Sequence, residues 1–259
     1  MTNKLFIGLA LCLFISANAV AQEDATSMQK TNKWEFLVEP YLLLPNMKGE
    51  VGIRNLPNAE VDANIGDIFS NLKFGFMLNA EATNGTWAVA SDFILMDLGA
   101  DVLERRLITG GEVGATQIAW EGSGFRRLNP WLEVGLGAMI NTVSADLDLT
   151  ITEIIGGEEF NVSASTSNTW FEPMLIARVR SKSEAKFIYT VRGEIGGFGI
   201  GSDFAWQLQA YAGYRFTKLF QMTAGYRVIS LDYETGSGQS RFLYDVTTSG
   251  PVISLGFNF

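Results

Sequence analysis

The sequence has no histidine, a single cysteine and few charged residues, which make up 18% of its 259 residues. Because histidine is the commonest general base and metal ligand, its absence excludes Ser-His-Asp catalysis, Cys-His catalysis and histidine-ligated zinc from this chain. The one cysteine, Cys12, lies in an apolar run near the N-terminus. The rest of the chain must therefore be stable without disulfide bonds.

Long apolar runs are missing as well. Outside the N-terminus, no uninterrupted apolar segment approaches the ~18 residues that a transmembrane helix needs, so a helical membrane protein is not expected. The formal net charge of −9 argues against nucleic acid as a partner.

The first residues have the features of an export signal. Lys4 supplies a positive charge, an apolar run follows it, and residues 19–21 have the small-x-small pattern of a cleavage site. We expect a cleaved signal peptide over residues 1–21, a short periplasmic tail over 22–32 and one domain over 33–259.

The pattern that the sequence does contain is alternation with a period of two residues. Phe74 and Phe76 alternate with Gly75 and Met77, and the strand they predict ends at Asn84-Gly85, a dipeptide typical of a tight hairpin turn. The same alternation recurs over residues 87–95, 132–141, 186–194, 204–216 and 220–228.

The composition of the two faces separates a soluble sheet from a membrane barrel. A soluble sheet has a charged outer face, whereas here one face is mostly glycine, threonine, asparagine and glutamine, and the other holds the aromatic residues. Among structures built from strands, only a closed barrel gives every backbone group at membrane depth a partner. The pattern therefore predicts an all-β fold, a closed antiparallel transmembrane β-barrel with its apolar side chains facing lipid.

Aromatic residues recur where the predicted strands leave the short turns. This placement is typical of an interfacial girdle, and ordinary strand aromatics are the alternative. The residues are Trp34, Trp87, Trp131, Phe187 and Phe220.

Short and long connections alternate along the chain and give the strand count. The short turns, near residues 84–85, 126–129, 181–185 and 217–218, would face the periplasm, and the longer segments, near 45–71, 100–111, 146–160 and 233–246, would be extracellular loops. With a tight outer turn at 199–202, the chain forms about ten strands. Twelve are possible if residues 49–65 form an additional hairpin.

Local features modify this plan at a few positions. Pro40, Pro173 and Pro251 lie within predicted strands, and each removes a ladder donor, so bulges or strand ends are expected there. Residues 65–72 could form a short helix.

The last residues carry the strongest single signal. The segment 251–259 alternates apolar with small or polar residues, and it resembles the C-terminal strand of bacterial outer-membrane β-barrels. In those proteins the final aromatic and alternate apolar residues are recognised by the barrel-assembly machinery. The resemblance gives that role to Leu255, Phe257 and Phe259.

Other segments resemble a family of small outer-membrane β-barrels of Gram-negative bacteria that has no assigned activity. The resemblance implies an outer-membrane location, with membrane lipid, lipopolysaccharide and the assembly machinery as partners, and it carries no catalytic residues across. The segments are residues 170–173, 192–198, 201–204 and 213–216.

Charged residues at inward-facing positions are the candidate functional residues. Acidic residues come mainly from the early strands and basic ones from the late strands, so the two sets would face each other across a closed barrel. The lumen-lining candidates are Glu35, Glu39, Glu81, Asp92, Glu133, Glu172 and Glu194 on the acidic side, and Arg178, Arg180, Lys186, Arg192, Arg215 and Arg227 on the basic side.

Two functions remain open at this point. A narrow aqueous pore with a transverse field would pass small polar solutes as a passive channel. Alternatively, the opposite charges pair into a plug, and the barrel is structural or binds partners through acidic extracellular loops, such as the hairpin expected near residues 145–159. We expect no enzyme activity, no cofactor and no metal site, and the oligomeric state does not follow from the sequence.

Overall fold

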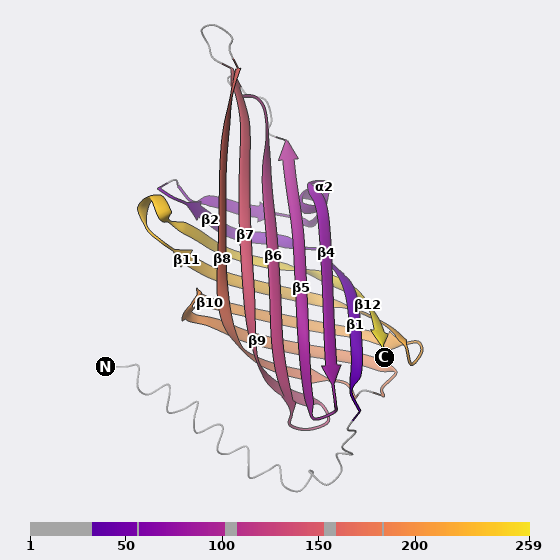
Figure 1. Cartoon of the computed structure of the whole chain (residues 1–259). Coiled ribbons are helices and arrows are strands. Elements are labelled where there is room, and N and C mark those ends of the chain that lie inside the picture. The colour runs from indigo at the N-terminus through magenta and orange to yellow at the C-terminus, as the bar shows by residue number, and fades with distance from the viewer. Residues whose placement is uncertain (1–32, 56, 102–107, 153–158, 183) are drawn as a thin grey trace, which may run out of the picture.

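A closed ring of ten antiparallel strands forms the wall of the protein (Figure 1). The structure, a computed structural model, describes residues 33–55, 57–101, 108–152, 159–182 and 184–259. Each strand pairs with the next, and β12 pairs with β1 to close the ring. The wall strands are β1 (Glu35–Leu43), β4 (Leu72–Thr83), β5 (Trp87–Asp101), β6 (Ile108–Arg127), β7 (Leu132–Thr152), β8 (Glu159–Arg180), β9 (Phe187–Ile200), β10 (Ser202–Arg215), β11 (Phe220–Thr235) and β12 (Phe242–Asn258).

The predicted all-β barrel of ten strands is therefore confirmed. The predicted signal peptide, 1–21, and the predicted tail, 22–32, lie outside the described residues. The short helix expected near residue 65 is α2 (Ile65–Ser70), which Asn64 caps by accepting hydrogen bonds from the backbone N–H groups of Gly66 and Asp67. Neither α2 nor the short 3-10 helix η1 (Gly238–Ser240), the helices of the described residues, is long and apolar enough to cross a membrane.

A hairpin outside the ring accounts for the additional strands that the sequence left open. It consists of β2 (Asn46–Ile53) and β3 (Ala59–Ala63). The last strand, β12, pairs with β1 over Val252–Asn258 and with β2 over Phe242–Ser249, so the hairpin extends the sheet beside the ring without entering it.

The three prolines mark the positions where strand pairing stops. Pro40 forms the last pair between β1 and β4, and Pro173 immediately precedes the first pair between β8 and β9. Pro251 lies where β12 changes its neighbour from β2 to β1. Each proline nevertheless lies inside its strand, so the bulges or strand ends expected at these positions are wrong, and only the pairing on one side of the strand stops or changes. Because even-numbered residues of β1 bond to β12, Pro40, which has no backbone N–H, leaves a gap in that ladder between Val38↔Phe257 and Tyr41↔Ser254.

The strands β6, β7 and β8 are 20 to 22 residues long, about twice the length that crosses a bilayer. The loops expected at 100–111 and 146–160 are therefore wrong for residues 100–101, 108–111, 146–152 and 159–160, which belong to strands, while 102–107 and 153–158 lie outside the described residues. The loop expected at 233–246 is likewise wrong at both ends, where β11 and β12 continue. The strands continue because hydroxyl side chains pair across them, as in the Thr142–Thr169 and Ser144–Ser167 hydrogen bonds of 2.9 and 2.8 Å.

The polarity of the long strands inverts part of the way along them. On β7 the outward positions from Leu132 to Ile140 are apolar, and the outward positions from Thr142 to Thr150 are serine, threonine or aspartate. Inward positions change in the opposite sense, from Glu133 to residues such as Leu147 and Leu149. We call the part of the wall between the short turns and this level the barrel half, and the part beyond it the outer half.

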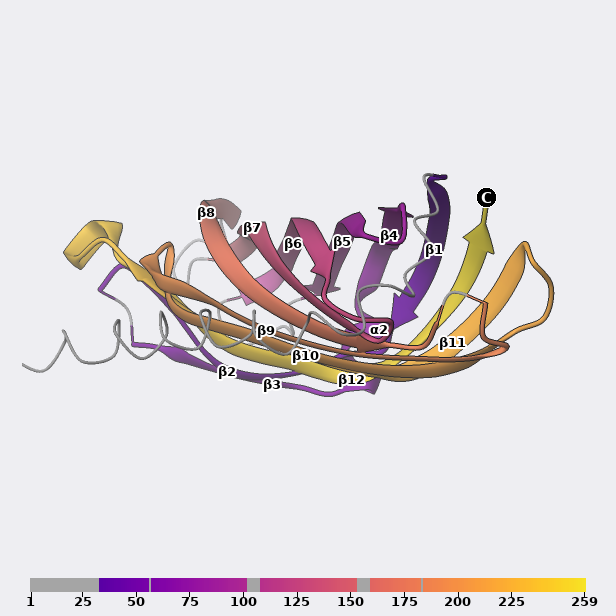
Figure 2. The same ribbon diagram turned by 90° about the horizontal axis from the view of Figure 1, so that it is seen from below.

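The outer half is split into two sheets. β8 pairs with β9 only from Met174 to Arg180, and β4 pairs with β1 only as far as Leu78. One sheet is β4–β8, and the other is β9–β12 with β2 and β3, as Figures 1 and 2 show. Buried side chains from both sheets, among them Trp170 and Tyr233, pack between them.

Candidate functional site: the barrel interior

The interior of the barrel half contains a polar cavity of about 950 Å³ near the short turns. Its lining includes turn residues such as Lys182 and Lys218, and deeper residues such as Tyr41, Gln209 and Tyr211. Ten of the thirteen predicted lumen residues line it, namely Glu35, Glu39, Glu81, Asp92, Arg178, Arg180, Lys186, Arg192, Arg215 and Arg227.

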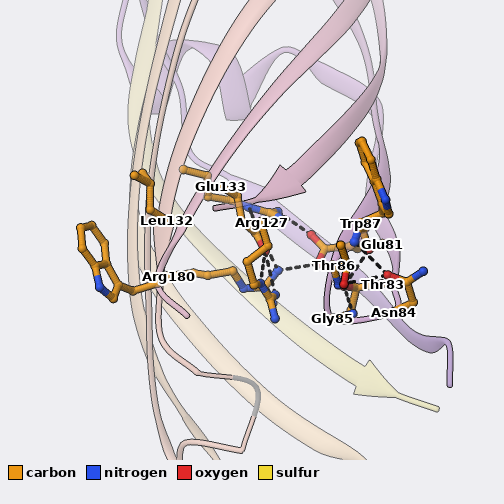
Figure 3. A network of polar contacts seen from close by, with 12 residues as sticks. Glu81, Thr83, Asn84, Gly85, Thr86, Trp87, Arg127, Leu132, Glu133 and Arg180 are labelled. Carbon is orange, nitrogen blue, oxygen red and sulfur yellow. Dashed lines mark hydrogen bonds and ion pairs between the residues drawn. The ribbon is translucent and has the colours of Figure 1, made fainter. Parts of the chain in front are cut away.

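A first cluster of ion pairs crosses the lower part of this interior. Arg178 Nη1 lies 2.5 Å from Glu81 Oε2, and its Nη2 lies 2.5 Å from Glu133 Oε2. Arg180 binds the other oxygen of Glu81 at 2.5 Å, and Arg127 binds Glu133 at 2.7 Å (Figure 3). Three cations and two carboxylates on four strands, β4, β6, β7 and β8, are thus joined in one network.

A second cluster lies deeper, towards the outer half. Arg192 pairs with Glu121 and with Glu194, the latter at 2.6 Å, and Arg227 pairs with Asp92 at 2.7 Å. All five of these side chains are buried. Since a buried charge is tolerated only when it is paired and hydrogen-bonded, these contacts hold the strands in one arrangement.

Phe125 separates the two clusters. Its ring lies 4.1 Å from the guanidinium carbon of Arg178 and 5.3 Å from that of Arg192, so it makes a cation–π contact with one member of each cluster. The ring is 1% exposed.

Glu172 differs from the other buried carboxylates. Its Oε1 accepts hydrogen bonds of 2.5 Å from Trp170 Nε1 and from Ser202 Oγ, and among the described residues it has no ion-pair partner. It lies at the boundary between the charged interior and the apolar core of the outer half.

That apolar core fills the interior beyond the ion pairs. Trp170 stacks on Tyr233 with ring centroids 4.3 Å apart, and it also contacts Phe242 and Tyr244 at 6.4 and 5.8 Å. Met174, below these rings, is 2% exposed. A cavity of only about 30 Å³ lies between this core and the ion pairs. In the described residues the interior is therefore open at the turn end and filled towards the outer half.

The acidic and basic sets predicted to face each other meet as ion pairs. Arg178 on β8 reaches Glu81 on β4, and Arg227 on β11 reaches Asp92 on β5, so each pair joins strands that are not neighbours. Arg192 on β9 reaches Glu121 on β6, a carboxylate that was not among the predicted residues. Glu35 and Lys186 are exposed at the mouth of the cavity, and Arg215 binds Gln221 at 3.1 Å.

Sequence reasoning missed four interior residues, Glu121, Phe125, Arg127 and Tyr41. A signal for two of them was present, because Ile118 and Trp120 alternate with Glu121 and Phe125 along β6. Arg127 belongs to a strand end that was assigned to a turn. The partners of Tyr41 are Asp92 at 2.8 Å and Arg227 at 2.9 Å, which are 51 and 186 residues away in the sequence.

The residues expected to form an assembly signal lie on the outside of β12 or at its end. Leu255 and Phe257 are opposite Met222 and Phe220 of β11. Phe259 donates a backbone hydrogen bond of 2.8 Å to Phe36 and accepts one of 3.1 Å from it. Their recognition by an assembly machinery stays a prediction.

No group of three or more histidine, cysteine, aspartate or glutamate residues in the described ranges is placed to hold a metal ion. The lack of an enzyme activity stays a prediction.

No protein-family model matches the chain, and no relative among curated proteins matches it. Solved structures that it is similar to include the outer membrane protease OmpT from Escherichia coli, with 7% identity, a TM-score of 0.40, and coverage of 88% of this chain and 97% of that one. Others are Ail, the attachment invasion locus protein of Yersinia pestis (14%, 0.35, 87% and 98%), and the CymD monoaromatic hydrocarbon channel (10%, 0.36, 93% and 92%). These are outer-membrane β-barrel proteins; the ring of strand pairs in this chain establishes its fold independently of them.

Proposed function

We propose that this protein is an outer-membrane β-barrel with a closed interior that presents its outer half to the medium as a binding surface. The observation that carries the proposal is the inversion of polarity along the long strands. In lipid a strand turns apolar residues outward, and in water it turns them inward. We therefore take the level of inversion as the outer surface of the membrane.

The dimensions of the apolar band support this placement. On β7 it extends from Leu132 to Ile140, which is about 30 Å of strand, or about 23 Å of depth at a tilt near 40°. Exposed aromatic residues, among them Trp87, Trp131 and Phe187, lie at the turn end of the band, and Trp120 and Phe171 lie near the inversion level. Two such levels are expected at the two interfaces of a bilayer.

The orientation follows from the connections. The short turns and the predicted periplasmic tail would lie on the inner side, and the long hairpins β5–β6 and β7–β8 would stand outside. The cavity of about 950 Å³ would then open to the periplasm. The predicted signal peptide supports export to this membrane.

A passive channel for small polar solutes is the second candidate, and the polar cavity favours it. The filled interior beyond it favours the closed barrel, because passage would require Trp170 and the residues stacked on it to move. We therefore place the closed barrel first.

Conductance across a planar bilayer tests the closed interior. The purified full-length protein should insert and show no steady current steps, whereas a Trp170→Ala, Tyr233→Ala double variant should show more frequent openings, because the rings that fill the interior are gone. Defined, ion-selective steps from the unchanged protein would overturn the closed barrel in favour of the channel.

Labelling with a membrane-impermeant maleimide tests the placement. Leu136→Cys and Ser144→Cys are a matched pair, since both lie on the outward face of β7, four positions to either side of Ile140. In intact cells the cysteine at position 144 should react and the one at 136 should not. Equal reaction at both positions would place the membrane elsewhere.

A further inference from the structure

The edge of β8 in the outer half has no strand beside it. β8 pairs with β7 over its whole length, from Leu132↔Val179 to Thr152↔Glu159, but with β9 only from Met174 onward. Within the described residues, 161–169 therefore have one row of backbone N–H and C=O groups without a strand partner.

Two contacts show which residues of β8 direct their backbone N–H and C=O groups to the free side. The carbonyl oxygen of Phe171 points at Gly201 in the β9–β10 turn, and that of Pro173 points at Gly196 of β9. The N–H and C=O of one strand residue point to the same side, and successive residues alternate. The free row thus belongs to the odd-numbered residues Asn161, Ser163, Ser165, Ser167 and Thr169.

This edge lacks the residues that usually prevent a free strand edge from pairing with another strand. Residues 161–169 contain no charge, no proline and no glycine. The corresponding free edge of the other sheet, β3, has five residues, and it includes Glu60 and Asp62. A long, uncharged strand edge is a ready template for another strand.

A second copy in the same membrane does not fit this edge. Two identical edges pair antiparallel about a two-fold axis perpendicular to the strands, which would turn one barrel upside down in the bilayer. A two-fold axis along the membrane normal places equal residues at equal heights, where N–H faces N–H. The occupant must therefore come from a different molecule.

The surroundings define the chemistry of that molecule. On the inner face of the edge Val162, 41% exposed, and Ala164 are apolar, while Thr166 and Asn168 are polar, so a strand added beside β8 would extend an apolar surface next to Val162 and Ala164. On the outer face Asp146 and Asp148 lie on β7, the strand next to β8, while Glu112 of β6, opposite Asp148, is paired with Lys73. Apolar side chains thus suit the inner face of the added strand, and neutral or basic ones suit its outer face.

We propose that the free edge of β8, from Asn161 to Thr169, binds an extended segment of a partner protein that alternates apolar with neutral or basic residues, by addition of a strand to the sheet. The inference rests on the proposed position of the outer half in water. The free backbone N–H and C=O groups of the five odd-numbered residues would supply the affinity. The acidic outer face would supply the preference for positive charge.

The experiment measures binding of a labelled probe to the purified full chain in detergent by fluorescence anisotropy. The probe is a blocked nine-residue peptide that alternates valine and lysine. A second probe has N-methylated lysines, which keep the charge and remove backbone donors, and a third has glutamate in place of lysine. Saturable binding of the first probe only is the expected result.

Two variants of the chain assign the binding to the edge. Ser165→Pro removes an N–H that faces the free side and leaves the β7 ladder intact, as Pro173 already does, so binding should weaken about tenfold or more at an unchanged melting temperature. Ser165→Ala keeps the N–H and should bind like the unchanged chain.

Three outcomes would overturn the proposal. Equal binding to Ser165→Pro would remove the edge as the site, and equal binding of the N-methylated probe would reduce the effect to charge. Self-association in detergent that Ser165→Pro abolishes would assign the edge to a copy in a facing membrane. Each of these results is independent of the conductance and cysteine-labelling experiments. The proposal of a closed barrel is therefore tested separately from the proposal of a binding edge.

Discussion

The barrel half and the outer half are built from the same strands with opposite polarity. In the barrel half Leu136 is 67% exposed and Glu133 is 1% exposed, whereas in the outer half Asp148 is exposed and Tyr244 is buried. The alternation itself does not change at the boundary; only the chemical class of each face does. With the barrel half in lipid and the outer half in water, as proposed, the difference teaches that the surrounding solvent selects the sequence pattern, while the strand geometry stays constant.

Closure of the sheet follows the same boundary. Under the proposed placement the barrel half must be a complete ring, because lipid offers no hydrogen-bond partner, whereas water can satisfy a free edge in the outer half. The two places where the sheet opens, beyond Pro173 on β8 and beyond Leu78 on β4, lie close to the level where polarity inverts.

Breaking the buried network should have the largest effect and should be specific to the barrel half. Arg178→Ala leaves Glu81 and Glu133 buried with fewer partners, which should cost about 3–5 kcal/mol of unfolding free energy. Urea unfolding in lipid vesicles, followed by tryptophan fluorescence, measures it. The control is Arg126→Ala, which removes an exposed arginine that stacks over Trp87 and should cost about 1 kcal/mol or less. Equal losses of unfolding free energy in the two variants would contradict a stabilising role of the buried network.

A charge placed on the outward face should distinguish the two halves directly. Leu136→Lys puts an ammonium group against lipid and should cost about 2–4 kcal/mol, while Ser144→Lys, on the same face of β7, should stay within about 0.5 kcal/mol. The same unfolding measurement applies. A cost at position 144 as large as at position 136 would mean that the membrane covers the outer half as well.

The smallest effect concerns acidic residues on the outer face. Burial raises the pKa of Asp232 above its ordinary value, and the neighbouring carboxylates of Asp245 and Asp203 raise it further. The folded state therefore holds this proton more tightly than the unfolded chain. Protonation of Asp232 therefore stabilises the folded state fully below the ordinary pKa of an aspartate, near pH 4. This stabilisation is lost as the pH rises through the raised pKa of the folded state.

Asp232→Asn should accordingly stabilise the protein at neutral pH by a few tenths of a kcal/mol, because Asp232 is largely exposed and salt screens it. The gain should vanish on acidification towards pH 3, where the aspartate is itself neutral. Unfolding curves at pH 7 and pH 3 test this. A gain of the same size at both values would point to a cause other than charge.

Much of the wall could be predicted from the sequence, because its signals are local. The alternation around Phe74 and the turn at Asn84-Gly85, where Gly85 has a φ of +83°, depend on neighbouring residues only. The two sets of opposite charge were also visible, since the acidic residues come mainly from the early strands and the basic ones from the late strands.

The outer half was harder to predict, because its strands look like loops when every outward position is expected to be apolar. Residues 142–150 alternate as regularly as 132–140, but with threonine, serine and aspartate on the outward face. Recognition of the inversion requires a comparison of both faces along one strand. The stack of Trp170 on Tyr233 and the partners of Tyr41 depend on contacts between distant strands, which no local pattern contains.

The double pairing of β12 has a consequence for the order of assembly. Its hydrogen bonds to β1 include Phe36 with Phe259, a separation of more than 200 residues, and no other strand pair of the described wall joins positions so far apart. Closing so long a loop carries the largest entropic cost in the ring, and such contacts form late. The β2–β3 hairpin, which begins at Asn46 directly after Pro45, docks on the far half of β12 and closes a loop of nearly the same length. The two pairings of β12 therefore share one loop-closure cost, so that once either has formed, the other follows with little further loss of chain entropy.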